Sequence, residues 1–585
     1  MKQLLIAILC CIVLSKTCLG QYYLRGQIKD EKGRPLTGVL IKLFSKGNLQ
    51  FFSGDNGLFG IPSQKKIDTI TLSFDGYETL CKPTETQQYQ TFILKMLPAT
   101  VRLLQNRLAS TTKNLLPSKQ LSLFGPLGES YSSLLENGFI TAEKYPETGF
   151  ALNIDRASYS NIRRFLNNNL KVPTNAVRIE EMLNYFNFSF QNVDNQQGQF
   201  SSFNQITNCP WNRNANLLFI NLNAPKLNVD SVPPSNLVFL IDVSGSMDKH
   251  NRLPLLQAGF KLLIKNLRAV DVISIVTYGG NVAVALPPTN GNEKSKINAV
   301  IDSLTANGDT PGEGAIHTAY ALAKSAFKKN GNNRIILATD GDFNVGQTSD
   351  QALEDMITIQ RQSGIYLTCL GVGMGNYKDS KLETLAKKGN GNFAYLDNAA
   401  EAEKVLVTEF TKTIYNVAND AYVNVVFDKK SVKKYRLIGF DNKKDAINDN
   451  TSKIEGGEVG SGHSTLAIFV VELEDTTKLI NNQSIATLKL TYKLAKQDST
   501  TTQTFPIIYQ PQQLYQTNAT LRLAAAVSMF GALLKNSTFA NNYSFSDVLE
   551  LANTAADKTS FIEQEFITLV QKADKIYNMS KKRRD

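Results

Sequence analysis

The sequence predicts a multidomain chain built around a central α/β domain with a doubly wound, mainly parallel sheet. Apolar runs at 238–241 and 335–338 contain β-branched residues and are typical of strands buried on both faces. Strand-like and helix-like segments alternate between residues 253 and 396, which favours a parallel sheet covered by helices on both faces. Because 585 residues are too many for one hydrophobic core, further domains are expected on either side.

Changes in composition and periodicity divide the chain into successive segments. The expected fold class is an N-terminal β-sandwich, the central α/β domain, and a flanking α+β region with a second β-sandwich and C-terminal helices. The predicted boundaries are a signal peptide at 1–20, a β-sandwich at 21–97, a linker at 98–145, an N-terminal flanking region at 146–234, the α/β domain at 235–410, and a sandwich with helices at 411–579. We expect the strand at 217–222 to pair with strands that follow Ala421, so that the α/β domain is inserted into one sandwich.

The first 20 residues have the features of a secretory signal peptide. Lys2 precedes an apolar run at 4–14, and Cys18-Leu19-Gly20 supplies a small-residue site with cleavage expected after Gly20. The run is too short to span a membrane comfortably, and the residues before Cys10 and Cys18 do not fit a lipoprotein signal. The mature protein is therefore expected in the periplasm, in the cell envelope or outside the cell, and not as a lipoprotein.

The chain is basic, with a formal net charge of +11 at pH 7. Its basic residues are scattered, apart from one cluster at 581–584. This cluster is read as a solvated tail, and weak attraction to an anionic membrane surface is the alternative. The sequence has neither an RNA-binding aromatic motif nor zinc-finger spacing, so nucleic acid is not an expected partner.

Oxygen-bearing side chains follow the two buried strands of the predicted α/β domain. The first strand ends in Asp242, with Ser244 and Ser246 on the following turn, and the second ends in Asp340. Between them, a glycine-bounded loop carries Thr310 directly before a helical segment. Open α/β sheets bind ligands at the carboxyl ends of their strands, and ligands that are all oxygen suit a hard cation such as Mg²⁺.

These three strand and loop ends, in this order, resemble the metal-ion-dependent adhesion site of von Willebrand factor A-type domains. The resemblance covers residues from about 235 to about 410. It implies five ligands for Mg²⁺ or Mn²⁺, namely Asp242, Ser244, Ser246, Thr310 and Asp340. It also implies that an Asp or Glu carboxylate of a partner protein completes the coordination of the metal. The alternative is that Ser244 and Ser246 only cap a helix and that Asp340 lies in an ordinary turn.

Two longer segments also resemble known families. The residues Gly26, Asp30, Gly33 and Pro35, with the later Gly76-Tyr77-Glu78, resemble a carboxypeptidase-regulatory-like domain, which has no peptidase chemistry. Helical segments near 156–186 and the sequence Cys209-Pro210-Trp211-Asn212 belong to a region that is similar, over most of 148–575, to a YfbK-like family of exported bacterial proteins.

No arrangement of residues in the sequence indicates catalysis. The only histidines, His250, His317 and His463, are dispersed and form no zinc-hydrolase motif. Neither a nucleophile elbow nor a phosphate-binding loop occurs. We therefore expect an exported binding or adhesion protein that is not an enzyme, with a non-catalytic assembly or chaperone-like subunit of an envelope complex as the alternative.

Two expectations concern the behaviour of the metal site. Gly308 and Gly312 allow backbone excursions around Thr310, so this loop is either an adjustable switch, as the resemblance implies, or only a tight turn. The fold is expected to survive metal removal because the strands build a core far larger than the site. Without the cation, Asp242 and Asp340 are expected to repel each other.

Overall fold

The computed structural model describes residues 22–95, 129–131 and 136–579, apart from short gaps. The gaps are 32, 48, 64, 75–76, 153, 187, 189, 191–198, 228–231, 309–311, 342–349, 375–376, 410–414, 441–456, 475–478 and 496–498. The predicted signal peptide, Thr310 and the basic cluster at 581–584 therefore lie outside the described residues. The chain divides into two compact units, Met1–Ala109 and Ser110–Asp585, which we call the N-terminal unit and the main unit.

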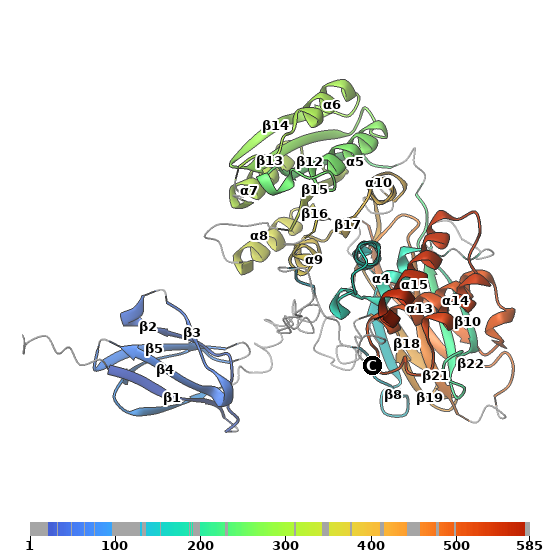
Figure 1. Cartoon of the computed structure of the whole chain (residues 1–585), viewed down its shortest axis with the longest axis horizontal. Coiled ribbons are helices and arrows are strands. Elements are labelled where there is room, and N and C mark those ends of the chain that lie inside the picture. The colour runs from blue at the N-terminus through green and yellow to red at the C-terminus, as the bar shows by residue number, and fades with distance from the viewer. Residues whose placement is uncertain are drawn as a thin grey trace, which may run out of the picture. The chain divides into compact units, whose positions relative to one another are not determined.

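The N-terminal unit, blue in Figure 1, consists of two sheets on one apolar core. Its strands are β1 (Tyr22–Asp30), β2 (Leu40–Leu43), β3 (Phe51–Phe52), β4 (Leu58–Ser63), β5 (Ile67–Ser73), β6 (Leu80–Glu85) and β7 (Tyr89–Leu94). One sheet has the order β4-β1-β7 and the other β3-β2-β5-β6. Alternate residues such as Leu24 and Ile28 of β1 and Ile70 and Leu72 of β5 are fully buried, because successive side chains of a strand point to opposite faces.

The α/β domain of the main unit has a six-stranded sheet in the order β14-β13-β12-β15-β16-β17. The strands are β12 (Ser235–Asp242), β13 (Val272–Gly279), β14 (Asn281–Asn290), β15 (Asn332–Thr339), β16 (Ile365–Val372) and β17 (Phe393–Leu396). Its helices are α5 (Leu253–Lys265), α6 (Lys294–Ser303), α7 (Gly312–Ser325), α8 (Asp350–Gln362), α9 (Asp379–Lys388), α10 (Ala399–Glu403) and the π-helical segment η6 (Lys404–Thr408). All pairs are parallel except β13 with β14, so the predicted α/β sheet is confirmed.

Helices cover both faces of this sheet, as the apolar runs predict. Val238 and Leu240 of β12 pack in the core that contains α7, α8 and α9. Leu237 and Phe239 point the other way, into the core that contains α5, α6 and α10, where the Phe239 ring stacks on Phe260 at a centroid distance of 4.2 Å. Every residue of β12 is buried, and such a strand reads as a continuous apolar run because neither face meets water.

The edge strand β14 was not predicted from the sequence. It folds back on β13 through Gly279 and Gly280, and Gly280 adopts a φ of +75°, which favours glycine. Most of its side chains are at least partly exposed, and it contains Pro287 and Pro288. Proline is accepted in sheets only at edges and bulges, so this segment resembles a loop in the sequence.

The main unit also contains a sandwich, which we call the main sandwich. Its strands are β8 (Ile140–Thr141), β9 (Glu147–Ala151), β10 (Ser201–Asn208), β11 (Asn216–Asn223), β18 (Asn416–Phe427), β19 (Val432–Leu437), β20 (Gly457–Gly460), β21 (Ser464–Leu473), β22 (Ser484–Leu494), β23 (Thr500–Ile508) and β24 (Pro511–Gln512). One sheet has the order β24-β10-β11-β21-β19-β8, and the other has β20-β18-β22-β23 with β9 paired to β18. An apolar core that includes Leu218, Val423 and Phe469 lies between them.

The chain enters the α/β domain after β11 and returns to the same sandwich after η6. β11 pairs antiparallel with β21 along its whole length, from Asn216 opposite Val471 to Asn223 opposite Ser464. The predicted insertion of the α/β domain is therefore confirmed. Within the segment 98–145 that we expected to be a linker, residues 140–141 form β8, which pairs with Lys434 and Tyr435 of β19.

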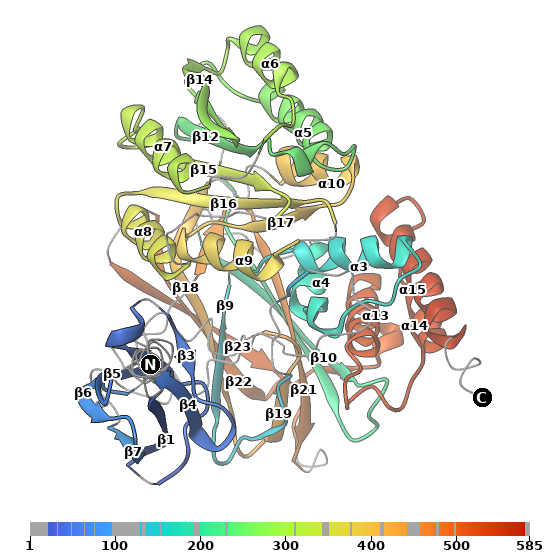
Figure 2. The same cartoon turned by 60° about the vertical axis from the view of Figure 1, so that its left-hand side comes forward.

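Five helices cover the outer face of the β10-β11-β21 region (Figure 2). They are α3 (Ala157–Asn167), α4 (Ile179–Tyr185), α13 (Ala519–Leu534), α14 (Phe545–Asn553) and α15 (Phe561–Met579). Gly531 allows α13 to approach α4 closely, because a Cβ there would lie 3.0 Å from Ile179 and from Met182. Among the helices of the described residues, none is both long enough and apolar enough to cross a membrane.

A buried arginine connects the helical layer to the α/β domain. Arg163 of α3 forms ion pairs with Asp397 and Glu401, which follow β17, and with Glu565 of α15. Its Nε donates to Asp397 Oδ2 over 2.7 Å, and its Nη1 donates to the Tyr185 hydroxyl over 3.0 Å. One cation therefore compensates carboxylates from two distant segments of the chain.

We predict that Arg163→Met lowers the free energy of unfolding by about 3–5 kcal/mol, because it leaves buried carboxylates without their cation. The measurement is urea unfolding followed by the fluorescence of Trp211, the only tryptophan of the chain. The matched control is Lys261→Met, since the Lys261–Asp302 pair is exposed and should change stability by less than about 1 kcal/mol. Equal losses in the two variants would contradict the prediction.

Candidate metal centre

Asp242 is the last residue of β12 and is fully buried at the carboxyl edge of the sheet. Its Oδ1 accepts the Ser244 backbone N–H over 2.9 Å, and its Oδ2 accepts the Thr339 hydroxyl over 2.8 Å. Burial raises the pKa of Asp242, the bonds from Ser244 and Thr339 act in the opposite direction, and the charge of Asp340 raises it further. The carboxylate is therefore held in one orientation, in a place where its charge is unfavourable.

The two motif serines lie on the turn that follows β12. Ser244 is buried, Ser246 is exposed, and their Oγ atoms are 3.1 Å apart. Ser244 precedes a single 3₁₀ turn, Gly245–Met247, and its side chain makes no cap hydrogen bond to that turn. The next helix, α5, begins after Arg252 rather than after a serine. The alternative that these serines only cap a helix is therefore wrong.

Asp340 directly follows β15, beside Asp242, because β12 and β15 pair in parallel with Ile241 opposite Ala338. It forms a buried ion pair with Arg252. Arg252 Nη1 also donates to the Ser246 carbonyl, and its Nη2 donates to the Met374 carbonyl, both over 2.7 Å. One guanidinium thus holds together the loops that follow β12, β15 and β16.

The charge of Asp340 raises the pKa of Asp242, as expected for two carboxylates that repel each other, and Arg252 compensates only one of the two. Arg252 supplies a positive charge to Asp340, whereas in the described part of the chain no lysine or arginine pairs with Asp242. No local pattern indicates this role, because Arg252 lies in a polar loop 88 residues away from its partner. Gly373, with a φ of +80°, makes room for it, since a Cβ there would lie 2.4 Å from Arg252 Nε.

The loop that leads to Thr310 is attached to the serine turn by its backbone. The Asn307 N–H donates to the Val243 carbonyl over 2.7 Å, and the Gly308 carbonyl accepts the Gly245 N–H over 2.9 Å. Gly308 has a φ of +79°, and a Cβ there would lie 2.7 Å from the backbone of Gly280. Close backbone packing therefore requires a glycine at position 308, which supports the interpretation of this loop as a tight turn. Thr310 itself lies outside the described residues, and its movement stays a prediction.

Four of the five residues predicted from the sequence therefore lie at one edge of the sheet: Asp242, Ser244, Ser246 and Asp340. They offer two carboxylates and two hydroxyls, a donor set that suits Mg²⁺ or Mn²⁺. The buried carboxylate of Asp242, whose charge no protein cation in the described residues compensates, fits a bound divalent ion.

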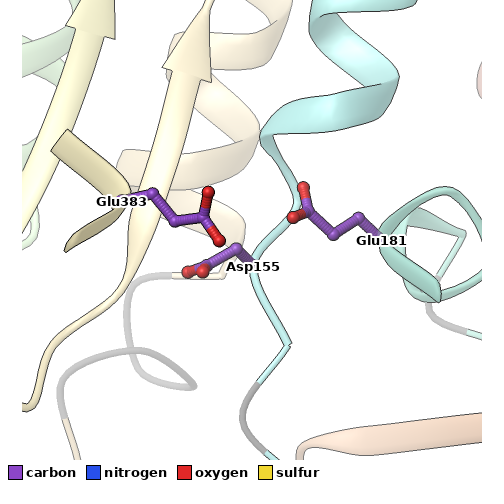
Figure 3. Close-up of side chains that lie close together, drawn as sticks. All are labelled: Asp155, Glu181 and Glu383. Carbon is purple, nitrogen blue, oxygen red and sulfur yellow. The ribbon is translucent and has the colours of Figure 1, made fainter. Parts of the chain in front are cut away.

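A second group of carboxylates, which the sequence did not indicate, lies between the helical layer and the α/β domain. One oxygen from each of Asp155, Glu181 and Glu383 lies within 4.8 Å of the others, and Figure 3 shows them converging from separate elements. Arg178 forms ion pairs with Glu181 and, over 3.8 Å, with Glu383, and Lys387 also pairs with Glu383. These cations compensate the group, so it forms a charged contact within the fold.

Comparison with known proteins agrees with this fold. Residues 236–409 match the model of the von Willebrand factor type A domain, residues 126–219 match one described as von Willebrand factor, and residues 412–576 match the C-terminal model of the uncharacterized protein YfbK. The fold and the match over 236–409 thus define a protein with a von Willebrand factor A-type domain. The chain is 36% identical over 505 residues to the uncharacterized protein YfbK of Escherichia coli K12, covering 82% of this chain and 87% of that protein. It belongs to the YfbK family.

More distant similarities are confined to parts of the chain. Inter-alpha-trypsin inhibitor heavy chain H2 of Sus scrofa is 25% identical over 214 residues, which is 34% of this chain and 22% of that protein. A solved structure described as von Willebrand factor type A from Catenulispora acidiphila has a TM-score of 0.38 and 15% identity, covering 63% of this chain and 88% of that one.

We predict that Asp242→Asn raises the stability of the protein in EDTA at neutral pH by about 1–3 kcal/mol, because it removes a buried charge whose pKa is raised. Thermal and urea unfolding in EDTA measure the change. Asp248→Asn, an exposed carboxylate on the same loop, is the control and should change stability by no more than about 0.5 kcal/mol. A lower stability of Asp242→Asn in EDTA would show that the charge itself is required by the fold.

Proposed function

We propose that this protein is exported and captures a protein partner through a divalent cation held by its von Willebrand factor A-type domain. The observation that carries the proposal is the gathering of Asp242, Ser244, Ser246 and Asp340 at the carboxyl edge of β12 and β15. In the described part of the chain, the buried Asp242 carboxylate has hydrogen-bond donors but no paired cation. Mg²⁺ or Mn²⁺ would supply the missing positive charge.

The ligand chemistry explains why such a site binds rather than catalyses. Asp242 and Asp340 would provide charged oxygens, and Ser244, Ser246 and Thr310 would provide neutral hydroxyl oxygens. A hydroxyl offers a lone pair without cancelling the charge of the ion, so a bound cation would attract an outside carboxylate. Arg252 strengthens this effect because it already compensates part of the charge of Asp340. An Asp or Glu side chain of the partner is therefore the expected recognition group.

The proposal also covers the first 20 residues and the N-terminal unit. We propose that residues 1–20 direct export to the periplasm, the envelope or the outside of the cell. We also propose that the N-terminal unit is a carboxypeptidase-regulatory-like domain. The two-sheet arrangement of 22–94 around one apolar core supports the second point. A role as a non-catalytic assembly subunit uses the same cation and the same partner carboxylate, and it differs only in the identity of the partner.

We predict that the purified protein binds one Mg²⁺ or Mn²⁺ and that Asp242→Ala abolishes this binding, because Asp242 supplies one of the two charged ligands of the predicted set. Isothermal titration calorimetry measures the affinity and stoichiometry. Asp248→Ala, on the same exposed loop, should bind the ion like the natural protein. Circular dichroism should show no loss of secondary structure in EDTA, since the core is larger than the site. Unchanged affinity in Asp242→Ala would exclude the assigned site.

We predict that capture of the natural partner from an envelope extract requires the cation and a carboxylate on the partner. Capture should be lost in EDTA and in Asp242→Ala, and reduced in Thr310→Ala if Thr310 switches between coordinating and free positions. Thr318→Ala is the control, because Thr318 lies two turns into α7 and its hydroxyl donates to the Gly314 carbonyl over 2.8 Å. If Thr310→Ala captures the partner normally in millimolar Mg²⁺ while Asp242→Ala does not, the site is static.

A further inference from the structure

A cavity of about 60 Å³ lies inside the main unit, away from the candidate metal centre. Its walls come from four parts of the fold: strands β15, β16 and β17 of the sheet, the π-helical segment, the segment 154–156 before α3, and the end of β20 at Gly460. Most of this wall is apolar. The cavity therefore lies where the inserted α/β domain meets the main sandwich, which is a common place for ligand sites.

One charged side chain of this wall has donors that lack acceptors. Arg334, near the start of β15, is 1% exposed. Its Nη1 donates to the Thr368 hydroxyl over 2.8 Å, and its guanidinium lies 5.6 Å from the centre of the Tyr366 ring. Its Nε and Nη2 are buried and have no hydrogen-bond partner within the described residues. A buried donor without an acceptor is costly, so these atoms require an acceptor from outside the chain.

The positions of Nε and Nη2 of Arg334 indicate which kind of acceptor fits them. Nε and Nη2 lie on one edge of the planar guanidinium and present two parallel N–H groups, the arrangement that binds both oxygens of a carboxylate. Arg156, which also lines the cavity, has an Nη2 without a partner in the described part of the chain. The cavity thus holds more donors than the surrounding protein uses.

The acidic residues of the wall already have donors of their own. The two oxygens of Glu458 accept the side-chain amides of Asn390 and Asn416. Glu409 forms an ion pair with Arg156 over 2.5 Å. The remaining acid, Asp155, accepts the Phe393 N–H over 2.9 Å. In the described residues, none of these carboxylates lies within ion-pair distance of Arg334. Glu458 acts on Arg334 through its charge alone, so the Nε and Nη2 donors of Arg334 stay open to an acceptor from outside the chain.

We propose that this cavity is a binding site for a small carboxylate of about the size of acetate, with its oxygens on Arg334 and its alkyl group against the apolar wall. A water molecule needs about 10–15 Å³ of such space, so 60 Å³ admits a ligand of about four non-hydrogen atoms. This site is separate from the candidate metal centre. Arg334 lies in β15 and Asp340 follows the end of this strand six residues later, which is about 20 Å of extended chain.

The test uses the full chain and sodium acetate as the probe, against sodium chloride at the same ionic strength. Acetate should raise the thermal unfolding temperature in a saturable way, because a ligand that binds only the folded protein stabilises it. Calorimetric titration with acetate should give one site, in EDTA as well as in Mg²⁺. Acetamide, which has the same shape without the charge, should have a much smaller effect. Equal shifts with chloride and acetate, or no shift with acetate, would overturn the proposal.

Two variants locate the effect, and a third serves as a control. Arg334→Met should abolish the acetate-dependent shift, and Arg213→Met, which removes an exposed arginine of the main unit, should leave it unchanged. Ala394→Leu keeps Arg334 but adds side-chain volume to the cavity wall, so it should also abolish the shift and serves if Arg334→Met does not fold. An acetate-dependent shift that persists in Ala394→Leu would place the binding elsewhere and overturn the proposal.

Discussion

The parallel pairing of β12 with β15 is the constraint on which the candidate metal centre depends. Both strands are buried along their whole length, and their register places Ile241 opposite Ala338. Asp242 follows this last pair by one residue and Asp340 by two, so both carboxylates lie at the same edge of the sheet. Once the strands are paired, the carboxylates cannot separate without disturbing the central core. The apolar packing of the strands thus brings the two carboxylates close together, and the loops add the hydroxyl groups of the site.

Buried arginines connect the parts of the main unit. Arg163 pairs with carboxylates that follow β17 and with Glu565, Arg178 pairs with Glu181 and Asp379, and Arg252 holds three loops together beside the metal site. Taking an arginine out of water is costly, so each of these residues uses several acceptors to compensate. Arg334, which lines the cavity, differs from them, because two of its nitrogens have no acceptor in the described chain. Arg163, Arg178 and Arg252 therefore join elements of the fold, whereas Arg334 is available to a ligand.

The insertion of the α/β domain brings its two ends together. The Ser235 hydroxyl at the start of β12 lies 3.0 Å from the Tyr415 hydroxyl, just beyond the end of the domain. Arg268 donates to the carbonyls of Val232 and Pro233 at the entrance, over 2.8 and 2.7 Å. A domain with adjacent ends can be placed in a loop of another domain without breaking its sheet. Both β11 before the insertion and β21 after it therefore complete the same sandwich.

The sequence by itself determined the features that repeat locally along the chain. Apolar runs located β12 and β15, helical periodicity located the covering helices, and the order of Asp242, Ser244, Ser246 and Asp340 located the candidate metal centre. The edge strand β14 escaped prediction because its prolines and exposed side chains lack the pattern of a buried strand. A strand that is buried on both faces, such as β12, has a continuous apolar run that can be recognised in the sequence. A partly exposed edge strand such as β14 has no such run.

Only the tertiary structure decided which charges meet. Arg252 reaches Asp340 across 88 residues of chain, Arg163 reaches Asp397 across 234, and the acidic group of Asp155, Glu181 and Glu383 comes from three separate elements. No local spacing encodes such contacts, because a long side chain can pair with whatever carboxylate the packing brings near. The cavity beside Arg334 is of the same kind. Its walls belong to two domains, so it exists only where their surfaces meet.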